Sequence, residues 1–68
     1  MKSISGKELC RILVNKGWQL KNIKGSHHVF MKYNRKERIS IPVHGNKSLK
    51  TGLLKAIMNI AEIAEDEL

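Results

Sequence analysis

Hydrophobic residues near the start of the chain recur with the period of an α-helix. Three of them follow one another at the i, i+3, i+4 spacing that lines one helix face: Leu9, Ile12 and Leu13. Ser5 and Glu8 precede this stripe at the spacing of a capping box, in which each side chain accepts a hydrogen bond from the other residue's backbone N–H. Gly17 follows the stripe and is suited to the left-handed conformation that ends many helices. The pattern predicts a helix over residues 6–16.

From Trp18 onward the hydrophobic period changes to two, which is the period of a β-strand. Alternating or β-forming residues occupy three segments separated by short polar links: residues 18–24, 28–33 and 38–43. Consecutive strands joined in this way predict an antiparallel meander. Pro42 has no backbone N–H to donate to a ladder, so it marks the end of the third strand or an edge position.

A second amphipathic segment begins near Thr51. Its apolar residues form one wide helical face: Leu53, Leu54, Ile57, Met58, Ile60 and Ala61. Carboxylates at a helix C-terminus oppose the helix dipole. The acidic end of the chain therefore predicts that this helix stops near Glu62 and that a short turn begins at Ala64.

The predicted order is α-β-β-β-α in a single domain, residues 1–68, because a chain this short can build only one core. We expect an α+β fold in which two helices pack on one face of a three-stranded antiparallel sheet. This is the architecture of double-stranded-RNA-binding domains, which contact RNA through its phosphates and 2′-hydroxyls. The fold alone supports only a binding module.

Positive charge is concentrated in the first four-fifths of the chain. The formal net charge is +7, and all 13 basic residues but only two of the six acidic residues lie within residues 1–55. Such a surplus is typical of proteins that bind nucleic acid, although a solvated basic surface gives the same composition. Lys47, Lys50 and Lys55 form a candidate phosphate-binding cluster around the start of the second helix, whose positive end would reinforce it.

Cysteine content and hydropathy indicate the cellular compartment of the protein. Cys10 is the only cysteine, so it cannot form an internal disulfide, and its place beside the first helix's apolar stripe predicts a packed thiol. No apolar run reaches the roughly 18 residues that a membrane span needs. We therefore expect a cytoplasmic protein without membrane contact.

Candidate chemistry is concentrated at Lys24-Gly25-Ser26-His27-His28, between the first two predicted strands. Neighbouring strand residues point to opposite faces, so His27 and His28 cannot chelate one metal ion, and no metal site is expected. RNA cleavage requires fewer protein groups than a metal site, because the substrate's own 2′-hydroxyl attacks the phosphate. The protein then supplies a base and cations that stabilise the developing negative charge. Strand histidines without a catalytic role are the alternative.

Several blocks spread in order over nearly the whole chain resemble one known family. They are Gly6-Lys7-Glu8-Leu9, Lys24-Gly25-Ser26-His27-His28-Val29-Phe30, Ile41-Pro42-Val43-His44-Gly45-Asn46-Lys47 with Leu49 and Lys50, and Gly52-x-Leu54-x-x-Ile57. Together they resemble the HicA toxins, the small mRNA interferases of type II toxin–antitoxin pairs. The resemblance implies a double-stranded-RNA-binding-domain-like fold, metal-independent and cofactor-free cleavage of mRNA that blocks translation, and neutralisation by a cognate HicB-type antitoxin.

The resemblance also implies site residues. The family's catalytic histidine directly follows Gly-Ser, which corresponds to His27, whereas His28 occupies a variable position. His44 matches a recurrent loop histidine of the family and is a candidate RNA contact. We expect the rest of the RNA-binding site to consist of Lys24, Lys47 and Lys50, which hold phosphates, and Gly25 and Ser26, which shape the turn. Thr51 and Glu62 depart from the proline and the glycine that often begin and end the family's second helix.

Two other classes of function stay open at this level. A non-catalytic RNA-binding module would use the same basic face to bind RNA without cleaving it. An interaction protein would use that face mainly to dock an acidic partner.

Overall fold

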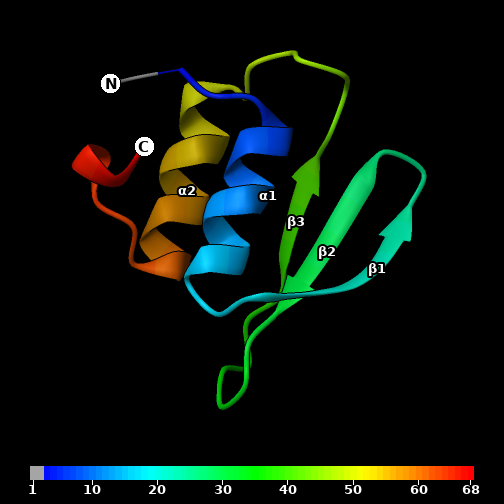
Figure 1. Ribbon diagram of the computed structural model, residues 1–68, viewed down its shortest axis with the longest axis vertical. Helices are drawn as coiled ribbons and strands as arrows, with labels where there is room; N and C mark the ends of the chain where they lie inside the picture. Colours follow the sequence, from blue (N-terminus) through cyan, green and yellow to red (C-terminus); the bar gives the residue numbers. More distant parts are fainter. Residues whose placement is uncertain (1–2) are drawn as a thin grey trace.

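The computed structural model describes residues 3–68, which form an α+β fold. The elements follow one another as α1 (Gly6–Asn15), β1 (Gln19–Lys24), β2 (His27–Met31), β3 (Ile39–Pro42), α2 (Thr51–Ala61) and the 3-10 helix η1 (Glu65–Glu67). The strands form one antiparallel sheet in the order β1-β2-β3, and the two α-helices lie side by side next to it (Figure 1). The predicted fold class and element order are confirmed.

The first helix begins with the predicted capping box. The backbone N–H of Ser5 donates to Glu8 Oε1 at 3.1 Å, and the backbone N–H of Glu8 donates to Ser5 Oγ at 3.2 Å. The helix ends at Asn15, one residue before the predicted end, and Gly17 follows with a φ of +96°. The start and the end of α1 are therefore set by local residues.

The middle strand is placed slightly earlier in the chain than its β-forming residues predict. It begins at His27 and ends at Met31, two residues short of the predicted end. A turn begins directly after the strand, because the backbone N–H of Arg35 donates to the carbonyl oxygen of Lys32 at 3.1 Å. Pro42 is the last residue of β3, and β3 is an edge strand, so both predictions made for this proline hold.

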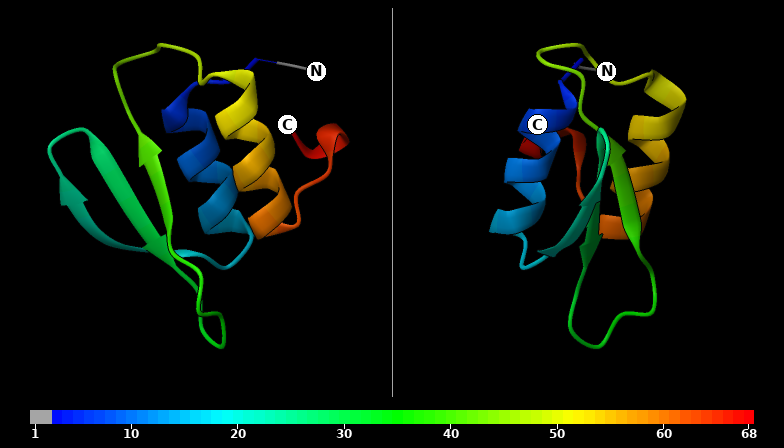
Figure 2. Two further views of the ribbon diagram at one scale, coloured as in Figure 1. Left: turned by 180° about the vertical axis from the view of Figure 1, so that it is seen from behind. Right: turned by 90° about the vertical axis from the view of Figure 1, so that its right-hand side faces the viewer.

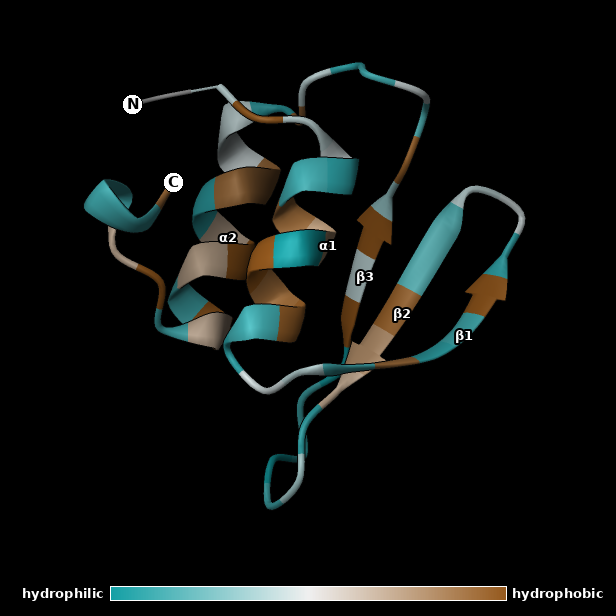
Figure 3. Cartoon of the chain, in the orientation of Figure 1, coloured by the Kyte–Doolittle hydropathy of each residue, from teal (hydrophilic) through white to brown (hydrophobic). Residues whose placement is uncertain are grey.

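Both helices pack against the same face of the sheet, where they form a single core (Figures 1 and 2). The fully buried side chains come from every layer: Ile4, Leu9, Leu13, Trp18, Phe30, Ile39, Ile41 and Leu54. Apolar residues from α1, α2, β2 and β3 meet there. Figure 3 shows hydrophobic segments, in brown, on each of these elements. The predicted packing of two helices on one sheet face is confirmed.

The first strand lies largely outside this core. Every residue of β1 is exposed, including Leu20 at 47% and Ile23 at 53%. The helices lie over β3 and the adjoining part of the sheet, and β1 is the strand farthest from them (Figure 1). Alternation in the sequence therefore predicted a strand here correctly, but no residue of the strand is buried.

The C-terminal end of α2 is closed by a residue that is not glycine. Glu62 adopts the left-handed conformation, with φ 57° and ψ 48°, and its side chain pairs with Arg35 Nη1 at 2.9 Å. Arg35 also donates to the carbonyl oxygen of Ile60 at 2.8 Å, and its guanidinium lies 5.8 Å from the centre of the Trp18 ring. The predicted helix end near Glu62, with a short turn from Ala64, is confirmed.

Within residues 3–68, no helix has the length and apolar content required to cross a membrane.

Candidate functional site

A two-residue turn joins the first two strands and positions the predicted catalytic histidine. Lys24 and His27 face each other across the β1–β2 ladder, so Gly25 and Ser26 form the turn between them. Gly25 has a φ of +57°, a conformation that glycine adopts without steric cost. Lys24 and His27, as directly opposed residues, present their side chains on the same face of the sheet.

The two adjacent histidines have different surroundings. Strand alternation directs them to opposite faces. His28 is opposite the buried Ile41, is half-buried, and has a buried Nδ1 without a hydrogen-bond partner among residues 3–68. His27 is exposed and opposite Pro42, on the face away from the helices. Only His27 is therefore open to a large ligand lying on the outer face.

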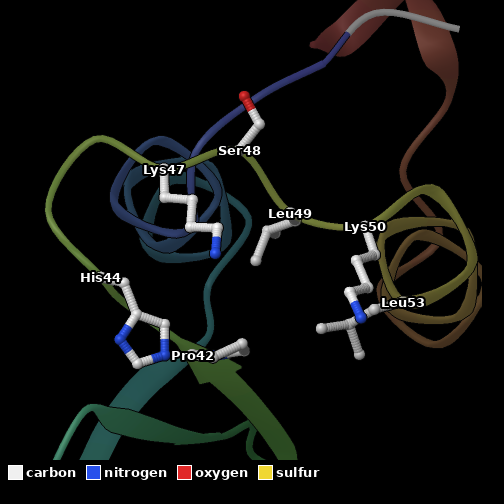
Figure 4. Close-up of a pocket in the computed structure, with 7 residues that line it drawn as sticks. All are labelled: Pro42, His44, Lys47, Ser48, Leu49, Lys50 and Leu53. Carbon is white, nitrogen blue, oxygen red and sulfur yellow. The ribbon is translucent and has the colours of Figure 1, made fainter.

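The connection from β3 to α2 forms a hollow next to the end of β3, where Pro42 pairs with His27. Its volume is about 250 Å³, and it is lined by Pro42, His44, Lys47, Ser48, Leu49, Lys50 and Leu53. The side chains of Lys47 and Lys50 flank the opening, the imidazole of His44 lies at one side, and the hydroxyl of Ser48 points away (Figure 4). The hollow thus combines an apolar lining with two ammonium groups.

Backbone contacts hold the connection against the rest of the fold. The backbone N–H of Leu49 donates to the carbonyl oxygen of Ile4 at 2.8 Å, and Ser48 forms an isolated antiparallel bridge with Ser5. The N–H of Lys47 donates to the carbonyl oxygen of His44 at 3.0 Å. Lys47 and Lys50 therefore project from a tethered segment.

The start of α2 faces solvent beside this segment. Lys50 is the N-cap residue, and no side chain caps the helix. A Cβ atom built on Gly52 would meet no atom within 4 Å. The first N–H groups of α2 therefore add positive potential next to the lysines.

One hydrogen bond and one strand pair connect the turn to the hollow. The N–H of Val43 donates to the carbonyl oxygen of Ser26 at 2.8 Å. Pro42 both faces His27 across the ladder and lines the hollow. The structure therefore brings seven predicted residues to one end of the sheet: Lys24, Gly25, Ser26, His27, His44, Lys47 and Lys50.

The lysine cluster predicted around α2 is divided in the structure. Lys47 and Lys50 line the hollow, whereas Lys55 lines a separate depression with Met58, Asn59, Ile63 and Glu65. The reason is the helical twist, since Lys55 is five residues beyond the N-cap and lies on another side of α2. Leu53 also lines the hollow and is 37% exposed, but it was not predicted as a site residue. The apolar face of α2, which is wider than core packing requires, could have indicated it.

The geometry does not favour a cysteine nucleophile or a metal site within residues 3–68. Cys10 packs against the core, and burial raises the pKa of its thiol, so it is a poor nucleophile. No group of three histidine, cysteine or acidic side chains able to hold a metal ion occurs among residues 3–68. What the arrangement offers is an exposed imidazole beside lysines and open helix N–H groups, which suits a phosphodiester.

Comparison with curated proteins gave no match. The family model described as the HicA toxin of bacterial toxin–antitoxin systems matches residues 6–63, which include both α-helices, the whole sheet and the hollow. Because this match extends over most of the 68 residues, the chain belongs to the HicA toxin family.

Proposed function

We propose that this toxin is a metal-independent endoribonuclease that cleaves mRNA in the cytoplasm and so inhibits translation. Membership of the HicA family gives the toxin role and implies a cognate antitoxin. The observation that supports the catalytic part is the position of His27, which is exposed at a sheet end that also carries Lys24, Lys47 and Lys50.

In the proposed reaction His27 is the general base. Its imidazole accepts the proton of a substrate 2′-hydroxyl, and the resulting oxygen attacks the adjacent phosphorus. The bond from phosphorus to the 5′-oxygen then breaks, which leaves a 2′,3′-cyclic phosphate on one product. The leaving 5′-oxygen takes a proton from solvent water or from a lysine.

The proposed reaction also requires cations near the phosphate. Negative charge builds on the phosphate oxygens in the transition state, and preorganised positive groups stabilise it. Lys24 lies opposite His27, and Lys47, Lys50 and His44 line the neighbouring hollow, so we assign them to RNA binding. Gly25 and Ser26 shape the turn that holds His27. A HicB-type antitoxin would neutralise the toxin by covering this face.

The two adjacent histidines provide a matched test. Purified protein, His27→Gln and His28→Gln are incubated with mRNA in EDTA, and thermal melts show that each variant is folded. Loss of a general base typically lowers the rate 10²- to 10⁴-fold, so we expect such a loss for His27→Gln and near-normal cleavage for His28→Gln. Undiminished cleavage by folded His27→Gln refutes the role of His27. Binding without cleavage by the unsubstituted protein identifies a non-catalytic RNA-binding module instead.

A further inference from the structure

We propose that the hollow between β3 and α2 is a subsite for one unpaired nucleobase of a single-stranded RNA, with the phosphates on either side of that base held by Lys47 and Lys50. This inference rests on the proposed function, because it names the form of RNA that the site accepts.

The lining of the hollow suits a flat apolar surface such as the face of a base. Pro42, Leu49 and Leu53 contribute the apolar side chains. Leu53 is 37% exposed and lies outside the buried core cluster, so its side chain is available for contact. A cavity of about 150 Å³ admits a benzene ring. The hollow, with about 250 Å³, therefore has room for a nucleobase.

The rim carries the charge that a nucleotide requires. The ammonium groups of Lys47 and Lys50 lie on opposite sides of the apolar lining (Figure 4). The start of α2, without a side-chain cap, adds N–H groups on the side of Lys50. An apolar lining between two cations matches a base with a phosphate before and after it, and cations that follow the backbone are typical of single-strand binding.

The place of the hollow relative to His27 indicates how such a base would be used. Pro42 is shared, since it faces His27 across the ladder and lines the hollow. A base held there would anchor the strand beside the imidazole, with a neighbouring phosphodiester on the outer face of the sheet. A duplex cannot occupy the subsite in this way, because its bases are stacked and paired.

Binding assays can separate the base from the phosphates. The probe is a short 2′-O-methyl RNA, which has no free 2′-hydroxyl to attack, compared with a strand of equal length built only from abasic nucleotides. We expect the unsubstituted protein to bind the strand with bases more tightly. Leu53→Ser should weaken that binding about fivefold, because it removes apolar surface that the base would cover, and leave the abasic strand unaffected.

Two controls accompany this variant. Leu20→Ser removes a leucine of similar exposure, 47%, from β1, away from the hollow, and should change neither affinity. Lys50→Gln should weaken both strands equally and reduce the slope of log affinity against log salt by about 0.7, the value for one phosphate contact on a single strand.

The outcomes distinguish the subsite from the function. If Leu53→Ser binds both strands as the unsubstituted protein does, the subsite is refuted while RNA binding and cleavage stand. If Leu53→Ser loses only its affinity for a protein antitoxin, the hollow is a protein contact and the subsite is refuted. If the unsubstituted protein neither binds nor cleaves RNA, the proposed function fails as well.

Discussion

Two glycines at the starts of the two helices should respond in opposite ways to the same substitution. Gly6 is the first residue of α1, and Gly52 is the second residue of α2. Alanine is the better helix former by about 0.5–1 kcal/mol, so both replacements would be stabilising if helix propensity alone decided the result. The surroundings that the added Cβ atom would meet differ between the two sites, and this difference decides whether the substitution stabilises or destabilises the protein.

At Gly6 the added methyl group has no space. Its Cβ would lie 2.3 Å from the carbonyl oxygen of Pro42, about 1 Å closer than ordinary van der Waals contact. The opposing atom belongs to the backbone, so the start of α1 must move away from the end of β3. Overpacking of this kind costs about 1–3 kcal/mol, which exceeds the propensity gain. We expect Gly6→Ala to destabilise the protein by about 1–2 kcal/mol.

At Gly52 the same methyl group meets no atom within 4 Å. Gly52→Ala should therefore stabilise the protein by about 0.5–1 kcal/mol. For a domain of this size 1 kcal/mol shifts the melting temperature by about 4–8 °C.

Thermal and urea unfolding followed by circular dichroism measure both effects, and unchanged m-values show that the unfolded states are comparable. If Gly6→Ala is as stable as Gly52→Ala, α1 does not approach β3 as closely as the structure shows, and the reasoning fails.

Three further predictions concern the C-terminal end and the thiol. Glu62→Gly should raise the melting temperature by about 2–4 °C, because relief of the left-handed strain at φ 57° outweighs an exposed pair with Arg35; a lower melting temperature would show that the pair dominates. The pKa of Glu67 lies below 4.5, first because its carboxylate accepts a hydrogen bond from the N–H of Ala64 and second because it pairs with Lys16. Its stabilising effect is therefore present above pH 4.5 and is lost as the pH falls through the lowered pKa. Urea unfolding of Glu67→Gln should therefore show a deficit at pH 7 that shrinks towards pH 3, and a deficit independent of pH would contradict this. Cys10 should react with iodoacetamide at pH 7 more slowly than a free thiol, because burial raises its pKa and packing limits access; an equal rate would place the thiol outside the core packing.

Features that depend on near neighbours in the chain could be predicted well. The capping box of Ser5 and Glu8 starts α1, and Pro42 ends β3 because it lacks an N–H. The opposite directions of His27 and His28 follow from the period of a strand, which needs no tertiary information. The selection of His27 as a candidate came from the resemblance to HicA toxins, and the family itself is confirmed.

Features that depend on how the elements pack could not be predicted. Trp18 and Leu20 alternate like core residues, yet only Trp18 is buried; Leu20 is exposed because the helices leave β1 uncovered. Lys47, Lys50 and Lys55 look equivalent along the chain, but the twist of α2 separates Lys55 from the other two.

The sequence by itself determined the helices, the strands and the charge, because hydrophobic period, capping and residue chemistry act over a few neighbouring positions, and its resemblance to a family supplied the candidate histidine. The tertiary structure alone decided that Pro42 is shared between His27 and an apolar hollow with a lysine rim. That arrangement joins residues from two strands, a loop and a helix, and only the register of the sheet and the packing of the helices bring them together.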